Sequence, residues 1–222
     1  MKKLILIDDH KMLRKGISAF FTENSDWEIL TEAESLDEIP QIIKIASASP
    51  DNKIVAIVDM QLKGTSENEI RDGFEAVKLL AEAGIPSCIF SSHDTGAVIE
   101  RAMSAEVGAK GFVSKLSDEK MLLDAVNTVA SGKTFVQPDL VASFMEMSSL
   151  FSILTKRERQ IVKLIQDGLT NEEITAQLQI KLTTLENYIS VIYDKIGCRD
   201  RGSLLEKLRW AILCRPYNPL CK

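Results

Sequence analysis

The stretch Ile54-Val55-Ala56-Ile57-Val58-Asp59-Met60-Gln61 decides the fold. Five apolar residues, most of them β-branched, run without interruption into a single acid, Asp59. A short run that is apolar throughout is typical of a strand buried on both faces, as in a parallel sheet. Asp59 then lies where the chain leaves the sheet, and the carboxyl ends of parallel strands are where open α/β sheets bind ligands.

Three other apolar runs end in the same way, each with polar residues at its carboxyl end. They are residues 4–7 followed by Asp8-Asp9, residues 85–90 followed by Ser91-Ser92, and residues 111–114 followed by Lys115. Three acids, a hydroxyl and an amine therefore converge on one edge of the predicted sheet. Clustered carboxylates repel each other unless a cation is present, and hard oxygen ligands with room for water suit Mg²⁺. This combination of groups is suited to moving a phosphoryl group.

The same half of the chain alternates between strand and helix patterns. Helices are predicted over residues 12–22, 36–48, 74–83, 95–107 and 117–130, and one more strand over residues 27–33. Five strands that alternate with five helices predict an α/β fold with a doubly wound, flavodoxin-like parallel sheet. Right-handed crossovers place the first strand beside the third.

The second half of the chain has a different character. Residues 132–152 combine turn residues with one short amphipathic helix near residues 140–147, and we predict a linker there, between a domain at 1–131 and a domain at 153–222. The second domain contains no strand-like run and ends in a short tail. Its four helices are predicted to begin at Thr155, at Thr170 or Asn171, at a turn over 181–184, and at Ser203. Two short helices joined by a tight turn form a helix-turn-helix, so this domain is predicted to be all-α.

Composition limits the function classes. The chain has 222 residues and a net charge of -5, so it has no overall basic character, and nucleic-acid binding requires a local patch. No apolar run approaches the ~20 residues of a membrane span, and we expect a cytoplasmic protein with no membrane partner. The four cysteines are widely spaced and form no metal-binding pattern.

Two groups of motifs resemble a known family. In the first half the motifs resemble the receiver domain of two-component response regulators; they are Asp8-Asp9-His10, Asp59-Met60-Gln61-Leu62, Gly73-Phe74-Glu75-Ala76, Ser91 and Gly111-Phe112-Val113-Ser114-Lys115. In the second half they resemble the LuxR-type helix-turn-helix; they are Leu154-Thr155-Lys156-Arg157-Glu158-Arg159, Gly168-Leu169-Thr170-Asn171-Glu172-Glu173-Ile174 and Lys195-Ile196-Gly197. In this order, the motifs are similar to those of NarL/FixJ-type regulators over nearly the whole chain.

The resemblance implies a phosphorylation site. Asp59 is expected to accept a phosphoryl group from a sensor histidine kinase. Asp8, Asp9, Asp59 and the backbone carbonyl of Gln61 are expected to surround Mg²⁺. No turnover on a small-molecule substrate is expected, so the protein is not expected to be an enzyme beyond gaining and losing this phosphoryl group.

The resemblance also implies a switch. Lys115 is expected to pair with the phosphoryl oxygens, and Ser91 and Phe112 are expected to move with them, which is a local charge event that biases a two-state element. In this family the change releases the second domain to bind double-stranded DNA and promotes a homodimer. The candidate DNA-contacting residues are Lys156, Thr170, Asn171, Thr183, Thr184, Glu186, Asn187, Tyr188, Lys195 and Arg199.

Several positions depart from the family pattern. Lys63 stands where a proline is usual, and the polar stretch 63–72, predicted to be a loop, is several residues longer than usual. Glu186 stands where a basic residue is common, and Tyr188 where a histidine is common. Because a carboxylate that faces phosphates is unfavourable, two functions remain open. The first is a phosphorylation-switched transcription factor, and the alternative is a regulator that acts through protein contacts or a phosphorelay with weak or no DNA binding.

Overall fold

The computed structural model describes residues 1–48, 52–62 and 70–210 of the chain. It divides into two compact units. The first contains the residues up to Val141 apart from Thr95–Ala97, and the second contains those three and the residues from Ala142 onward. No helix in the described ranges is both long enough and apolar enough to cross a membrane.

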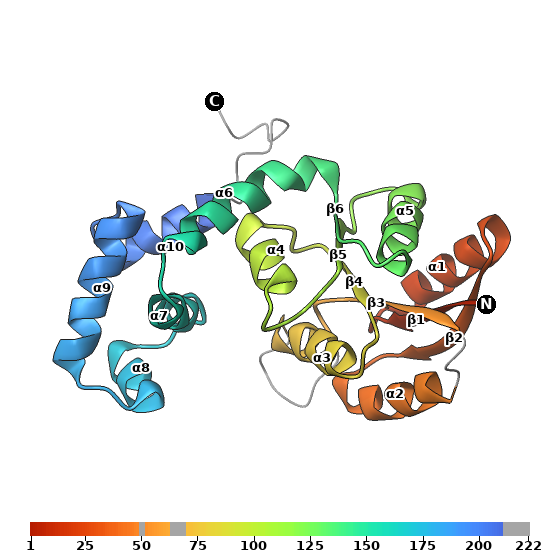
Figure 1. The fold of residues 1–222 in the computed structure, drawn as a ribbon, viewed down its shortest axis with the longest axis horizontal. Coiled ribbons are helices and arrows are strands. Elements are labelled where there is room, and N and C mark those ends of the chain that lie inside the picture. Colours follow the sequence, from red (N-terminus) through yellow and green to blue (C-terminus); the bar gives the residue numbers. More distant parts are fainter. Residues whose placement is uncertain (49–51, 63–69, 211–222) are drawn as a thin grey trace. The chain divides into compact units, whose positions relative to one another are not determined.

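The first unit is built on a parallel sheet of six strands in the order β2-β1-β3-β4-β5-β6 (Figure 1). The strands are β1 (Lys2–Ile7), β2 (Trp27–Ala33), β3 (Lys53–Val58), β4 (Ser87–Ser91), β5 (Gly111–Ser114) and β6 (Phe135–Val136). The parallel sheet is confirmed, as is the prediction that the first strand lies beside the third. β1 and β3 pair in register, with Ile7 opposite Val58, so their carboxyl ends lie side by side.

The sheet contains one strand more than the sequence predicts. β6 pairs with β5, with Gly111 opposite Phe135 and Phe112 opposite Val136. The sequence predicts a linker over these residues because Gly132 and its neighbours are typical of turns, and a strand of two residues is too short to show a period. The first unit therefore extends into the predicted linker.

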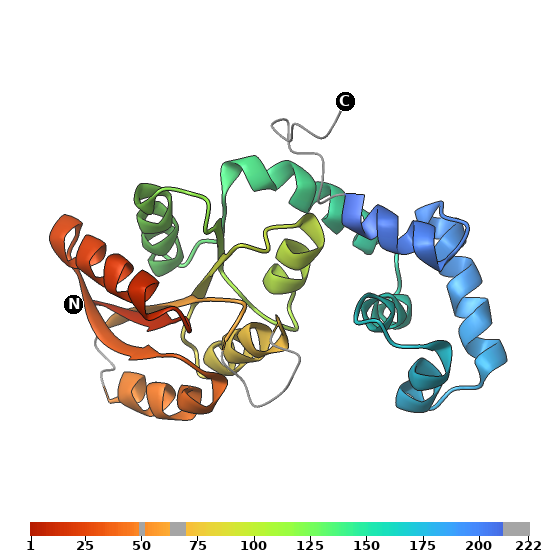
Figure 2. The same cartoon turned by 180° about the vertical axis from the view of Figure 1, so that it is seen from behind.

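Helices cover both faces of the sheet. α1 (Lys11–Asn24) and α5 (Glu119–Ala130) lie on one side, and α2 (Ile39–Ser47), α3 (Ile70–Glu82) and α4 (Gly96–Met103) on the other (Figures 1 and 2). Leu4 and Leu6 of β1 pack in one core cluster with Phe21 of α1 and Leu122 of α5. Ile5 and Ile7, which alternate with them along β1, are also fully buried, which explains why the strands are apolar on both faces.

Two boundaries in this unit differ from the predictions. α3 begins at Ile70, so the last part of the predicted loop over 63–72 is helical, and residues 63–69 lie outside the described residues. α4 ends at Met103, whereas the apolar pattern predicts a helix to residue 107. Residues 105–107 form a turn that leads to Gly108, which has a φ of +85°.

The second unit is helical throughout its described length. The 3₁₀ helix η2 (Pro138–Leu140) belongs to the end of the first unit. The helices that follow are α6 (Val141–Ser152), α7 (Lys156–Gln166), α8 (Asn171–Leu178), α9 (Leu182–Ile196) and α10 (Arg201–Trp210). α6 is longer than predicted, because Ser148 and Ser149 lie inside it. Ile161, Ile174 and Leu185, from α7, α8 and α9, are fully buried in one shared core.

The ends of these helices follow from local sequence. Thr155 and Thr170 each accept a hydrogen bond from the backbone three residues on and form capping boxes, so Thr170 rather than Asn171 caps α8. Ser203 does not cap α10, contrary to the prediction. The helix begins two residues earlier, and Oδ1 of Asp200 accepts the Ser203 backbone N–H at 2.7 Å. Aspartate is as strong a cap as serine, which explains the shift.

Candidate functional site

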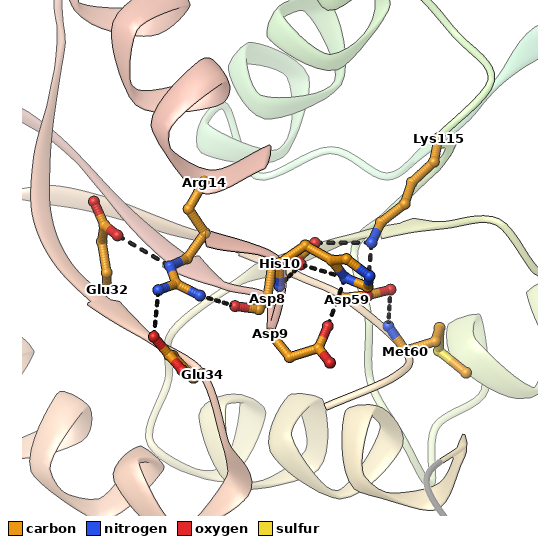
Figure 3. Close-up of polar contacts among 9 residues, drawn as sticks. All are labelled: Asp8, Asp9, His10, Arg14, Glu32, Glu34, Asp59, Met60 and Lys115. Carbon is orange, nitrogen blue, oxygen red and sulfur yellow. Dashed lines mark hydrogen bonds and ion pairs between the residues drawn. The ribbon is translucent and has the colours of Figure 1, made fainter. Parts of the chain in front are cut away.

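Three carboxyl groups gather at the carboxyl edge of the sheet (Figure 3). Asp8 and Asp9 follow β1 and Asp59 follows β3, and these strands are bonded neighbours. One oxygen of each carboxyl group and one ring nitrogen of His10 all lie within 4.8 Å of one another. The structure therefore brings Asp59 next to Asp8 and Asp9, which lie far from it in the sequence.

Lys115 bridges two of these acids (Figure 3). Its Nζ lies 2.6 Å from Oδ2 of Asp59 and 2.8 Å from Oδ2 of Asp8. Burial raises the pKa of Asp59 above its usual value, and the Lys115 ammonium group opposes that rise. Burial alone would lower the pKa of Lys115, but its hydrogen bonds to the two acids raise it. Lys115 therefore stays protonated at neutral pH and offsets part of the negative charge.

His10 is the fourth member of this group. Its Nδ1 lies 2.6 Å from Oδ1 of Asp9 and 3.3 Å from Oδ1 of Asp8, although its side chain is 65% exposed. The His10 backbone N–H donates to Oδ1 of Asp8 at 2.7 Å. The sequence places His10 near the site but does not show that its ring faces the acids.

The donor set fits a hard divalent cation. Oδ1 of Asp9 is buried and, in the described part of the chain, has no hydrogen bond despite its short approach to His10. Three carboxylates with one such unsatisfied oxygen match the ligands that Mg²⁺ takes. Gln61, whose carbonyl is the remaining predicted ligand, lies two residues past Asp59, and its backbone forms a hydrogen bond with that acid.

The loop after β3 is held by a close contact with α3. A Cβ atom on Gly73 would lie 2.5 Å from Cα of Met60 and 2.6 Å from the carbonyl oxygen of Asp59. Both distances are shorter than real Cβ contacts, and the atoms met are backbone atoms that cannot turn away. Met60 N–H in turn donates to Oδ1 of Asp59 at 2.7 Å. Gly73 therefore sets how closely α3 approaches the residue that carries the central acid.

Gly73→Ala is expected to destabilise the protein by about 1–3 kcal/mol, because the added methyl group forces the loop and α3 apart. Chemical denaturation of the whole chain measures this change. Gly16→Ala is the matched control, because a Cβ on Gly16, inside α1, meets nothing within 4 Å. Alanine is the better helix former, so the control is expected to be neutral or slightly stabilising. Equal stability of Gly73→Ala and the wild type would refute the close-contact argument.

Ser91 and Phe112 lie near this edge and are fully buried. Ser91 is the last residue of β4, and its Oγ accepts the backbone N–H of His93 at 3.0 Å. Phe112 lies on β5, three residues before Lys115. Ser91 therefore lies on the strand next to β3, and Phe112 lies one strand further from the acids.

Arg14 is a site residue that sequence reasoning missed. It is only 5% exposed, and it pairs with Glu32 at 3.0 Å and with Glu34 at 2.8 Å (Figure 3). Its Nη1 also donates to the backbone carbonyl of Asp8. The guanidinium group of Arg14 therefore holds the turn that carries Asp8 and Asp9, and the two glutamates balance the positive charge of Arg14. An arginine four residues into a helix gives no local signal that it is buried.

The second unit presents the candidate nucleic-acid interface. Thr183, Thr184, Glu186 and Asn187 are exposed in the first turns of α9. Of the other predicted contacts, the exposed ones are Lys156, Thr170, Lys195 and Arg199, and the half-buried ones are Asn171 and Tyr188. Tyr188 packs against the core of this unit. Glu186 lines a shallow groove with Asn171 and Arg201.

Lys195 is committed to a partner inside the domain. Its Nζ lies 2.9 and 2.7 Å from the two carboxylate oxygens of Glu158, which is 4% exposed. Burial alone would raise the pKa of Glu158, but its hydrogen bonds, the one from Lys195 first, lower it below its usual value. The ammonium group of Lys195 therefore ties α9 to α7. The sequence did not indicate this role, because the two residues are far apart in the chain.

Comparison with known proteins supplies the families. Residues 4–127 match the response regulator receiver domain, and residues 152–207 match the bacterial regulatory proteins of the luxR family. The chain is 27% identical over 201 residues to the transcriptional regulatory protein DesR of Bacillus subtilis, covering 90% of this chain and 93% of that protein. It is 26% identical over 204 residues to the response regulator protein VraR of Staphylococcus aureus, covering 90% and 92%.

The fold is also similar to that of solved structures. RcsB from Salmonella enterica serovar Typhimurium, bound to promoter rprA with the phosphomimetic BeF₃⁻, has a TM-score of 0.57 at 19% identity, covering 93% of this chain and 97% of that chain. A structure of two RcsB dimers bound to two parallel DNAs has a TM-score of 0.58 at 19% identity, with the same coverage. At this identity the likeness concerns the fold alone.

Proposed function

This chain belongs to the response regulator receiver domain family and carries a luxR-family DNA-binding domain behind the receiver domain, and on that basis we propose that it accepts a phosphoryl group on Asp59. The observation that carries the proposal is the position of Lys115, whose Nζ contacts Asp59 at 2.6 Å and Asp8 at 2.8 Å beside Asp9. The Asp59 carboxylate thus has the Lys115 ammonium group and two further acids, which are candidate metal ligands, beside it.

The chemistry follows from these groups. A carboxylate oxygen of Asp59 bonds to phosphorus while the phosphorus–nitrogen bond of a kinase phosphohistidine breaks, and the imidazole leaves with the bonding electrons. The Lys115 ammonium group opposes the rise that burial causes in the pKa of Asp59, and it pairs with the phosphoryl oxygens once they arrive. Asp8, Asp9 and Asp59, with the backbone carbonyl of Gln61, would hold Mg²⁺. When bound, Mg²⁺ supplies positive charge that offsets the charge on the phosphoryl oxygens.

The output of the switch is DNA binding by the second unit. We propose that phosphorylation promotes a homodimer that binds double-stranded DNA in the cytoplasm, since helix-turn-helix dimers match two-fold symmetric sites. The RcsB structures with DNA support this reading at the level of the fold. The alternative, a regulator that acts through protein contacts, is favoured by the carboxylate of Glu186 on α9 and by the pairing of Lys195 with Glu158.

Asp9→Ala tests the metal site. Loss of a ligand is expected to raise the Mg²⁺ concentration needed for half-maximal phosphorylation by about tenfold or more, while Asp59 still reacts at saturating Mg²⁺. Intact-protein mass spectrometry after incubation with acetyl phosphate measures the phosphorylated fraction. Asp26→Ala, which removes an exposed acid paired with Lys2, is the control and should leave the Mg²⁺ dependence unchanged. An unchanged dependence in Asp9→Ala would exclude Asp9 as a ligand.

A further inference from the structure

The side chain of Gln137 bonds to both ends of the loop that carries Lys115. Oε1 of Gln137 accepts hydrogen bonds from the backbone N–H of Ser114 at 2.9 Å and from Oγ of Ser117 at 2.5 Å. These two residues stand on either side of Lys115. Gln137 is 6% exposed, so its amide is fixed in place and cannot exchange these bonds for water without moving.

The remaining bonds of this network reach two other segments. Oγ of Ser114 donates to Oδ2 of Asp94, in the loop after β4, at 2.5 Å. The backbone N–H of Gln137 donates to the carbonyl of Phe112 at 3.0 Å, and its Nε2 donates to Oδ2 of Asp139 at 3.0 Å. The network therefore joins the ends of β4 and β5 to the residues that lead into α6.

The Gln137 side chain does not serve the helix that it precedes. It stands at the N-cap of η2, where a side chain usually accepts a hydrogen bond from its own helix, but it makes no capping bond. Its oxygen instead accepts hydrogen bonds from a loop that lies 20 to 23 residues earlier in the chain. Without that acceptor, the buried N–H of Ser114 would lose its partner, which is costly enough to displace the loop.

We propose that Gln137 is a positioning residue for Lys115 and that it transmits the state of the phosphoacceptor pocket to the segment before α6. The proposal rests on the proposed role of Asp59. When a phosphoryl group draws the ammonium group of Lys115 toward itself, the loop between Ser114 and Ser117 is displaced with it. Gln137 is bonded to both ends of that loop, so the displacement favours a different arrangement of residues 137–140.

Gln137→Leu removes the acceptor and is expected to slow phosphorylation by acetyl phosphate at saturating Mg²⁺ about tenfold. The double variant Gln137→Glu with Asp139→Asn is the matched control. Its carboxylate still accepts both bonds, and the new amide at position 139 donates to it, so a rate within about twofold of the wild type is expected. If position 137 only needed a side chain that fills space, Gln137→Leu would keep the wild-type rate.

The link to α6 has its own readout. Hydrogen exchange of the peptide that covers residues 137–147, with and without beryllofluoride, is expected to change in the wild type and the double variant but not in Gln137→Leu. If Gln137→Leu does not fold, Ser117→Ala replaces it, with an expected slowing of about threefold.

Each outcome decides the question. Three results would overturn the proposal. Gln137→Leu could be phosphorylated at the wild-type rate, or the double variant could fail to restore that rate. Hydrogen exchange could also respond to beryllofluoride in the same way in all variants. Failure of the proposed function looks different, because the wild type itself then gains no phosphoryl group on Asp59.

Discussion

Asp59→Asn is expected to reduce phosphorylation by acetyl phosphate with Mg²⁺ below detection. The amide has the shape of the carboxyl group and keeps an oxygen to accept the Met60 N–H, bonded at 2.7 Å in the wild type. It lacks the anionic oxygen that attacks phosphorus. Lys115 loses one partner but keeps Asp8 at 2.8 Å. The variant therefore keeps most contacts of the site but loses its nucleophile. Peptide mass spectrometry locates any phosphoryl group that the variant still gains.

The control must separate loss of the nucleophile from loss of charge. Asp26→Asn removes one negative charge from an acid that is 71% exposed and precedes the amino end of β2, away from the carboxyl ends of the strands, and it should be phosphorylated like the wild type. The Asp59→Asn protein could become phosphorylated on Asp8 or Asp9. Such a product counts as a side reaction only if the phosphoryl group of the wild type is found on Asp59. A wild-type signal on any other residue contradicts the assignment.

The acid cluster could be predicted because its causes are local. Each strand that is buried on both faces leaves a continuous apolar run in the sequence, and each run ends in a polar residue that must lie at the sheet edge. Parallel pairing then brings Asp8 and Asp59 together without any knowledge of side-chain contacts. β6 is the exception, since Phe135 and Val136 owe their strand conformation to pairing with β5 rather than to a pattern of their own.

The supporting residues could not be predicted because their partners are set by tertiary structure. Arg14 pairs with Glu32 on β2 and with Glu34 just past the end of that strand, and Gln137 bonds to a loop on the other side of α5 in the sequence. Lys195 looks like a phosphate contact from its motif, but it is paired with a buried carboxylate. Long polar side chains are usually exposed, so the sequence gives no sign that these side chains have fixed partners inside the protein.

Glu186→Lys is expected to strengthen binding to all DNA sequences. Glu186 is exposed in the second turn of α9, the helix that should enter the major groove, and a carboxylate there repels phosphates. Reversing its charge creates one phosphate contact, so the salt dependence of binding should steepen by about one unit per protomer. If Glu186 instead accepts a hydrogen bond from a cytosine amino group, the preferred site weakens by about 1–3 kcal/mol while nonspecific binding strengthens.

Asp194→Lys makes the same charge change on the same helix and serves as the control. Asp194 is exposed and lies eight residues further on, about 12 Å along the helix axis. That distance exceeds the ~10 Å screening length at 0.1 M salt, so its substitution should leave the salt dependence closer to that of the wild type. Salt-titrated binding to fragmented genomic DNA, followed by sequencing of the retained fragments, compares the two variants. If Glu186→Lys changes neither affinity nor salt dependence on any DNA, α9 is not the recognition helix, and regulation through protein contacts becomes the better account of the second unit.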